Sequence, residues 1–199
     1  MKQAGVILAS ASPRRRELLA AIGVSFRAVS AEVDETPRIG EDVSDLVRRL
    51  ALEKARRVAG SEKESLVIGA DTLVAVGGRI LGKPSDAKEA AEMLYSLSGR
   101  SHDVLTGLAF VKSDELLEEN CVTISKVTFK NLSAVTIEKY VATGEPLGKA
   151  GAYAIQGLGA GLIERHEGSF TNIVGLPVTE LLGFLLRFGT ERIKWEPLR

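Results

Sequence analysis

Short apolar segments alternate with amphipathic helical segments along this chain, and this alternation limits the fold more than any other feature. Residues 6–10 (VILAS) and 66–76 (LVIGADTLVAV) have the continuous apolar character of buried strands. Residues 43–59 carry apolar side chains at three- and four-residue spacing, which predicts a long amphipathic helix. Interleaved strands and helices are typical of an α/β fold. We therefore expect a sheet with flanking helices.

Residues that begin or end helices define the other elements. Proline suits the first helical turn and glycine suits the C-terminal end, so a helix is expected from Ser12 and Pro13 to Gly23. We also expect helices at 85–99, 133–144 and 176–189, an extended segment at 24–33, and strands at 102–113, 119–132 and 162–168. The expected caps are Ser85 for the helix at 85–99 and Ser44 or Asp42 for the helix at 43–59, and Gly77–Gly78 is expected to form a hairpin turn.

Charge and composition exclude several classes of protein. Lys plus Arg and Asp plus Glu number 26 each, so the formal net charge is zero. Proteins that coat DNA or RNA are usually basic overall, and a stable nucleic-acid partner is therefore not expected. No stretch approaches the roughly 18 apolar residues of a membrane span, and the N-terminal apolar run is too short for a signal peptide. We expect a cytoplasmic, soluble protein without a membrane partner.

Metal sites built from sulfur or imidazole are also excluded. Cys121 is the only cysteine, and the two histidines, His102 and His166, lie far apart in the sequence. A disulfide or a zinc cluster of cysteines is therefore impossible within one chain. Any metal is expected to be a hard cation held by carboxylate and phosphate oxygens.

Three consecutive arginines, Arg14, Arg15 and Arg16, follow the expected helix start. A helix N-terminus is already partially positive and usually favours acidic side chains, so cations there point to a bound anion. The Ser10 hydroxyl and the first backbone N–H groups of the helix add further donors. The alternative is that the arginines face water, as most basic runs do. Successive helical residues point about 100° apart, so at most one or two can reach a ligand, and Arg14 is best placed.

Carboxylates occur at two informative places. Asp71 follows Gly69 and Ala70 on an apolar strand, and strand ends are where α/β proteins place many site residues, although an aspartate there can also form a turn. Glu35 lies in the acidic segment 33–36 (VDET), whose alternative interpretation is a solvated turn. If these carboxylates converge, they can hold Mg²⁺ and activate a water molecule.

Lysines and a glycine-rich segment supply further candidates. Lys54, Lys83 and Lys149 can stabilise charge on a phosphate leaving group, although each alone is consistent with an ordinary surface lysine. The segment 151–161 (GAYAIQGLGAG) allows a backbone to approach a ligand closely, and Gln156 within it can read a base edge through its paired donor and acceptor. The alternative is a flexible loop. The sequence lacks a P-loop, a dinucleotide fingerprint, a nucleophile elbow and a Cys–His pair.

Taken together, these segments resemble the Maf family of nucleoside triphosphate pyrophosphatases, also called septum formation inhibitor proteins. The resemblance covers nearly the whole chain and is carried by ILASASPRRRELL, EVDETPR, LALEKA, GADTLV, GKPSDA, LSGRSHDVLTG, YVATGEPLGKAGAYAIQG and NIVGLPVTEL. It implies a fold related to the inosine triphosphate pyrophosphatases: one domain over 1–199, with a mixed twisted sheet and flanking helices in two lobes around a central cleft. It also implies a homodimer and hydrolysis between the α and β phosphates with a divalent cation, Mg²⁺ or Mn²⁺.

The resemblance also assigns roles to individual residues. It implies that Asp71 accepts the proton of the attacking water, and that Arg14, Thr72 and Gln156 determine the substrate. The local sequences SPRR, ADT and IQG are similar to those of the subgroup that favours dTTP and UTP, rather than the subgroup that acts on 7-methyl-GTP.

Combined with the residue chemistry, the hypothesis is a metal site at Glu35 and Asp71 with Lys54, Lys83, Lys149 and Ser10 around the substrate.

Two functions of another class remain open. A non-catalytic, nucleotide-binding regulator of septum formation needs the same arginine and glycine-rich segment but not the water-activating Asp71. A DNA-binding repressor of septation is disfavoured by the neutral charge. Nucleotide binding by both wild-type and Asp71→Asn protein, without turnover by either, would support the regulator.

Overall fold

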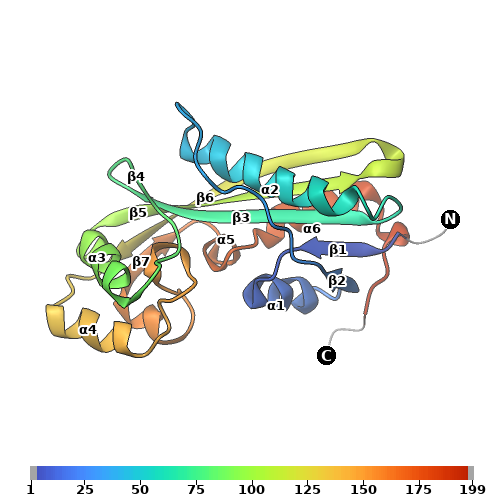
Figure 1. Cartoon of the computed structure of the whole chain (residues 1–199). Coiled ribbons are helices and arrows are strands. Elements are labelled where there is room, and N and C mark those ends of the chain that lie inside the picture. The colour runs from blue at the N-terminus through green and yellow to red at the C-terminus, as the bar shows by residue number, and fades with distance from the viewer. Residues whose placement is uncertain (1–3, 197–199) are drawn as a thin grey trace. The chain divides into compact units, whose positions relative to one another are not determined.

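The structure of the chain, a computed structural model, describes residues 4–196 (Figure 1). The helices are α1 (Pro13–Ala21), α2 (Val43–Ala59), α3 (Ala87–Leu97), α4 (Ala134–Ala142), α5 (Phe170–Val174) and α6 (Val178–Phe188), with short 3₁₀ helices η1 (Ser113–Glu115), η2 (Ala150–Ala152), η3 (Gly157–Leu162) and η4 (Thr190–Arg192). The strands are β1 (Val6–Ala9), β2 (Phe26–Ala28), β3 (Leu66–Val76), β4 (Arg79–Leu81), β5 (Ser101–Lys112), β6 (Leu117–Phe129) and β7 (Ile163–Glu167). Within these residues, no helix has both the length and the apolar character needed to cross a membrane.

Within the described residues, seven strands form one mixed sheet in the order β2-β1-β3-β5-β6-β7, with β4 paired to β3. Strand β1 runs parallel to both β2 and β3, whereas β4 and β7 are antiparallel to their neighbours. The register pairs Ala9 with Gly69, so the carboxyl end of β1 lies beside the middle of β3. The sheet and its helices confirm the mixed α/β fold expected from the sequence.

The chain divides into two compact units, and three of the four boundaries along the sequence fall inside long strands. The first unit comprises the residues up to Asp71, Thr106–Thr123 and the residues from Gly175 onward, and the second comprises Thr72–Leu105 and Ile124–Val174. Strands β3, β5 and β6 therefore each contribute residues to both units.

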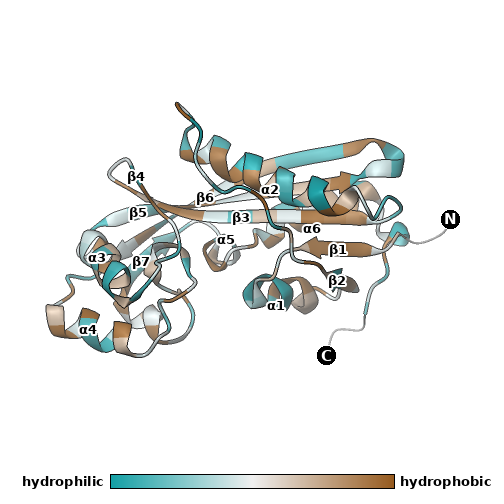
Figure 2. Ribbon diagram, in the orientation of Figure 1, coloured by the Kyte–Doolittle hydropathy of each residue, from teal (hydrophilic) through white to brown (hydrophobic). Residues whose placement is uncertain are grey.

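Strand alternation produces two apolar layers in the first unit. Val6 and Leu8 of β1 face one layer, which contains apolar side chains of α1 and α6, while Ile7 and Ala9 face the other layer, which contains α2. All four are buried, and Figure 2 shows β1 as a hydrophobic strand between helices of mixed character. The sheet of this unit thus has helices on both faces.

The second unit has one apolar cluster around α3 and α4. Strand residues Val104, Val127 and Phe129 pack there with Leu94 and Ile137 of the two helices. Buried His102 also contacts Phe129 and Tyr153 edge-on, with ring centroids 5.1 and 5.4 Å apart. Aromatic rings therefore fill the middle of this cluster.

The helix caps agree with the expectations with one exception. Asp42 caps α2 by accepting from Asp45 N–H, and Ser133 caps α4. The expected cap Ser85 is wrong, because the side chain of Asp86 accepts the first-turn N–H of α3. The Ser85 hydroxyl and N–H instead donate to the Glu89 carboxylate. The short helix α5 was not expected from the sequence.

Candidate active site

The corner between β1 and α1 is organised by the hydroxyl of Ser10. Ser10 is 7% exposed, and its Oγ accepts from Ser12 N–H at 3.2 Å and from Arg15 Nη1 at 3.2 Å. Arg15 Nε also donates to the backbone oxygen of Gly175 at 2.8 Å. Pro13 occupies the start of α1, where its missing N–H costs no helical hydrogen bond. The corner therefore holds one arginine in a fixed position.

The three arginines of α1 have different surroundings. Arg16 is exposed, whereas Arg14 and Arg15 are half-buried. Burial lowers the pKa of the Arg15 guanidinium, with the Asp71 carboxylate raising it and the charge of Arg14 lowering it further. A desolvated cation beside a carboxylate is a common feature of functional sites. Together with its hydrogen bonds to Ser10 and Gly175, this makes Arg15 a further candidate site residue, beside the Arg14 that the sequence analysis favoured.

Helix α2 places Lys54 on its apolar face. Leu50, Ala51, Ala55 and Val58 are buried on this face, and Lys54 is only 7% exposed among them. A lysine is almost never this buried without an ionic partner. The helical spacing of the sequence therefore carried a signal for this residue, because position 54 falls within the apolar stripe.

Close packing of β3 on α2 brings Asp71 to this lysine. A Cβ atom on Gly69 would lie 2.1 Å from the backbone oxygen of Ala51 and 2.9 Å from Ala55 Cβ. Only glycine permits this approach. Asp71 lies two residues further along the strand, on the same face as Gly69, and therefore also faces α2. Its side chain is buried beside Lys54.

The Lys54 ammonium bridges two carboxylates. Its Nζ lies 2.5 Å from Asp71 Oδ1 and 2.6 Å from Glu35 Oε1. The Asp71 side chain is 9% exposed and that of Glu35 is 51% exposed, so one carboxylate is buried and the other reaches solvent. The two carboxylates predicted to converge do so around a shared cation.

The same pair of carboxylates is suited to Mg²⁺, a hard divalent cation. Within residues 4–196, no group of three or more His, Cys, Asp or Glu side chains is placed to hold a metal ion. Mg²⁺, however, is usually held by one or two protein carboxylates, with water and substrate phosphates completing its shell. Asp71 and Glu35 both reach a single cationic atom, so their arrangement fits that requirement.

The remaining predicted residues belong to the second unit. Thr72 follows Asp71 on β3 and is half-buried, and Lys83 is exposed in the loop after β4. Lys149 donates to the backbone oxygen of Glu145. Gln156 is exposed directly before η3.

Comparison with known proteins assigns the chain to a family. The Maf-like protein family matches residues 5–188. The chain belongs to the Maf family. A dTTP/UTP pyrophosphatase of Pelotomaculum thermopropionicum is 49% identical over 184 residues, covering 92% of this chain and 96% of the relative. A dTTP/UTP pyrophosphatase of Myxococcus xanthus is 50% identical over 184 residues, covering 92% of each chain. A HAM1 protein from Coxiella burnetii matches 65% of this chain and 75% of its own with a TM-score of 0.45 and 16% identity.

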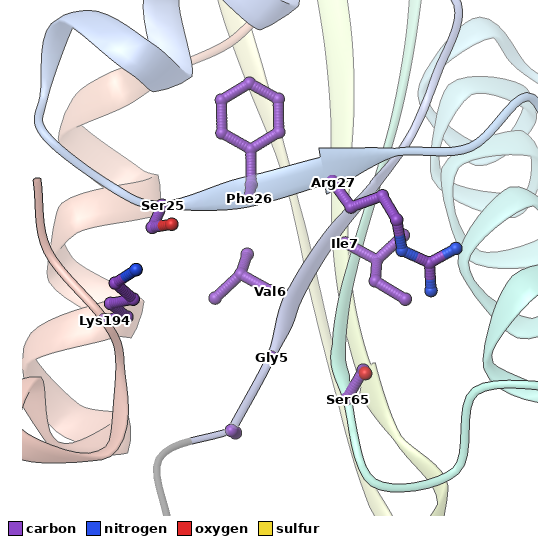
Figure 3. A pocket seen from close by; sticks show the side chains of 9 residues that line it. Gly5, Val6, Ile7, Ser25, Phe26, Arg27, Ser65 and Lys194 are labelled. Carbon is purple, nitrogen blue, oxygen red and sulfur yellow. The ribbon is translucent and has the colours of Figure 1, made fainter.

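A surface pocket of this Maf-family chain lies away from the candidate site. It has a volume of about 220 Å³ and is lined by the start of β1 and by Ser25, Arg27, Ser65 and Lys194, as Figure 3 shows. Arg27 is already paired with Glu62 at 2.6 Å. The pocket thus lies at the start of β1 and β3, whereas Ser10 follows the end of β1 and Asp71 lies further along β3. None of the predicted site residues lines this pocket.

Proposed function

We propose that this Maf-family protein hydrolyses nucleoside triphosphates between the α and β phosphates, with dTTP and UTP as preferred substrates. The observation that carries the proposal is the buried Asp71 carboxylate, held 2.5 Å from the Lys54 ammonium and in the field of Arg15. Its support in the comparisons is that relatives 49% and 50% identical over 92% of this chain carry the name dTTP/UTP pyrophosphatase.

The proposed chemistry is the attack of water on the α-phosphorus. Asp71 takes one proton from the water, a new oxygen–phosphorus bond forms, and the bond from the α-phosphorus to the bridging oxygen breaks. The products are the nucleoside monophosphate and pyrophosphate. Lys54 and Arg15 provide positive charge where negative charge accumulates on the phosphates, in a largely buried setting where electrostatic interactions are strong.

The other predicted residues take binding roles in this proposal. Arg14 and Ser10 donate to the triphosphate from the corner between β1 and α1, and Lys83 and Lys149 add positive charge for the departing pyrophosphate. Thr72 and Gln156 read the base. An amide such as that of Gln156 offers both an acceptor and a donor, which matches the adjacent N–H and carbonyl of uracil and thymine.

We further propose a divalent cation, Mg²⁺ or Mn²⁺, held by Asp71 and Glu35. When bound, the cation would supply charge neutralisation at the phosphates and orientation of water. Removal of divalent cations with a chelator is expected to abolish pyrophosphate release, and addition of Mg²⁺ or Mn²⁺ is expected to restore it. Full activity in excess chelator would refute the metal requirement.

The test of the function is pyrophosphate release from a panel of nucleotides: dTTP, UTP, CTP, dATP, GTP and 7-methyl-GTP. Wild-type protein is expected to act on dTTP and UTP, and Asp71→Asn to lose about 10²-fold or more of the rate. Asp45→Asn, an exposed aspartate on α2, is the matched control. Activity on 7-methyl-GTP instead would refute the assignment of Arg14, Thr72 and Gln156.

A non-catalytic regulator of septum formation is the second candidate, and nucleotide binding separates it from the enzyme. Calorimetric binding of UTP by both wild-type and Asp71→Asn protein, with no pyrophosphate release by either, would support the regulator. We also propose a cytoplasmic homodimer that makes no stable complex with nucleic acid. Sedimentation equilibrium and DNA binding at two salt concentrations test those statements.

A further inference from the structure

Glu145 caps the short helix that follows Gln156. It lies after α4 in the second unit, and its carboxylate accepts from the backbone N–H groups of Leu158 at 3.0 Å and Gly159 at 3.3 Å. These residues form the first turn of η3, which begins immediately after Gln156. A helix start leaves its first N–H groups without helical partners, and a carboxylate satisfies them especially well. Glu145 therefore holds this turn from a distant position in the sequence.

The phenol of Tyr140 extends the contact to the other side of Gln156. Tyr140 lies on α4 and is only 5% exposed. Its hydroxyl donates to Glu145 Oε1 at 3.4 Å and accepts from Ala154 N–H at 3.2 Å. The backbone before Gln156 and the backbone after it are thus tied to one carboxylate, the first through Tyr140 and the second directly.

Glycines in this segment serve close packing. Gly157 has a φ of +73°, and a Cβ atom on it would lie 3.0 Å from Glu145 Oε1. A Cβ atom on Gly159 would lie 2.3 Å from the backbone oxygen of Ala154 and 2.6 Å from the Tyr140 hydroxyl. The backbone on either side of Gln156 is therefore fixed by tight contacts, in contrast to the flexible loop that glycine content alone allows.

A fixed backbone matters because of the symmetry of an amide side chain. The glutamine amide carries one acceptor and one donor group, and a rotation of about 180° exchanges their positions. One orientation pairs with the N–H and carbonyl edge of uracil or thymine, whereas the other pairs with the edge of cytosine. The contacts of Tyr140 and Glu145 are to the backbone on either side of Gln156, so they fix the point from which the amide approaches a base edge.

We infer that Glu145 is a positioning residue for base selection: it fixes the backbone that carries Gln156, so that the amide meets the base from one direction and favours uracil and thymine over cytosine. This inference rests on the proposed function, because that function assigns Gln156 to the base of a pyrimidine nucleotide. Glu145 acts through the N–H groups of Leu158 and Gly159 and does not itself touch the substrate.

The test compares kcat/KM for UTP with kcat/KM for CTP in three variants. Glu145→Ala removes both acceptors and is expected to lower the UTP-to-CTP ratio about tenfold, equivalent to about 1.4 kcal/mol. Glu145→Gln keeps one acceptor, so its UTP-to-CTP ratio is expected to lie between those of wild type and Glu145→Ala. The change is expected mainly in KM for UTP. Glu138→Gln, an exposed glutamate of α4, is the matched control and is expected to keep the wild-type ratio.

Two further measurements and one further variant make the result independent of folding and turnover. Amide hydrogen exchange at Leu158 and Gly159 is expected to accelerate in Glu145→Ala and Glu145→Gln while the exchange of core strands stays unchanged. Tyr140→Phe removes only the hydroxyl and is expected to lower the ratio in the same direction. Calorimetric dissociation constants for UTP and CTP, measured in the Asp71→Asn background, report the selectivity without catalysis.

The outcomes separate this inference from the proposed function. Faster exchange at Leu158 and Gly159 with an unchanged UTP-to-CTP ratio would overturn the inference and leave the enzyme intact. Equal losses for both nucleotides would also overturn it, because they indicate only structural damage. Absence of turnover in wild type would refute the proposed function, and the ratio of dissociation constants would then still decide the role of Glu145.

Discussion

His102 gives the second unit a pH-dependent stability whose size follows from its burial. The imidazole is 2% exposed, its Nε2 lies 2.9 Å from the Tyr153 hydroxyl, and two aromatic rings contact it edge-on. Burial lowers the pKa of His102 from 6.5 to about 4. The folded protein therefore holds this ring neutral at pH values where the unfolded chain protonates it.

The sign and magnitude follow from linkage. Between about pH 6.5 and pH 4 the unfolded chain binds one more proton than the folded chain, so the free energy of unfolding falls as the pH falls. One pKa unit corresponds to about 1.36 kcal/mol, and the full decrease is thus about 3 kcal/mol. Below about pH 4 the folded protein also binds the proton, and this contribution stops changing.

The assay is urea unfolding followed by circular dichroism from about pH 7 to about pH 4, in wild type and His102→Phe. Phenylalanine keeps the ring contacts but cannot bind a proton. The difference in unfolding free energy between the two proteins is expected to change by about 3 kcal/mol across this range. The same substitution at His166, which is exposed, is the control. A difference between wild type and His102→Phe that stays constant with pH would refute the reasoning.

Three further predictions concern the first unit. Lys54→Met leaves two carboxylates without their shared cation, so urea unfolding should show a loss of about 3 kcal/mol and pyrophosphate release should fall; Lys88→Met, an exposed lysine, should change neither. Gly69→Ala puts a Cβ atom 2.1 Å from a backbone oxygen of α2, so the midpoint of urea unfolding should fall by the equivalent of about 2 kcal/mol, whereas Gly82→Ala, in open space, should be tolerated. Hydrogen bonds from the Arg49 side chain and from Arg38 N–H lower the pKa of Glu41 from 4.5 to about 2. The contribution of Glu41 to stability is therefore complete above about pH 4.5 and disappears as the pH falls through 2. Acid unfolding of Glu41→Gln should lack this step.

Each of these predictions has a clear contrary result. Wild-type stability in Lys54→Met would mean that the carboxylates do not depend on the lysine. An unchanged midpoint in Gly69→Ala would mean that β3 and α2 can separate at little cost. Identical acid unfolding of wild type and Glu41→Gln would show that the ion pair between Arg49 and Glu41 contributes nothing to stability.

Local patterns were sufficient to predict most of the fold. The apolar stripe of 43–59 and the run at 66–76 predicted α2 and β3 with the bounds that the structure has. The choice between two neighbouring capping residues was not predictable from the sequence. Ser85 and Asp86 are both good capping residues, and only the structure shows that Asp86 binds the N–H of Glu89 while Ser85 binds its carboxylate.

Local patterns in the sequence also predicted part of the candidate site. Asp71 stood out because it is a carboxylate on an apolar strand, whereas Lys54 was only one of three candidate lysines, each consistent with an ordinary surface position. The choice of Arg15 depends on its hydrogen bond to Gly175, 160 residues away in sequence, and no local pattern reports such a contact. The cap by Glu145 on η3 likewise joins segments that are not adjacent in the chain.

The site of water attack is the central claim, and turnover of UTP in ¹⁸O-labelled water tests it most directly. Mass spectrometry of the products locates the heavy oxygen after a single hydrolysis. Attack at the α-phosphorus, with Asp71 as the base, predicts one ¹⁸O atom in UMP and none in pyrophosphate. Label in pyrophosphate, or release of inorganic phosphate in place of pyrophosphate, would contradict the account.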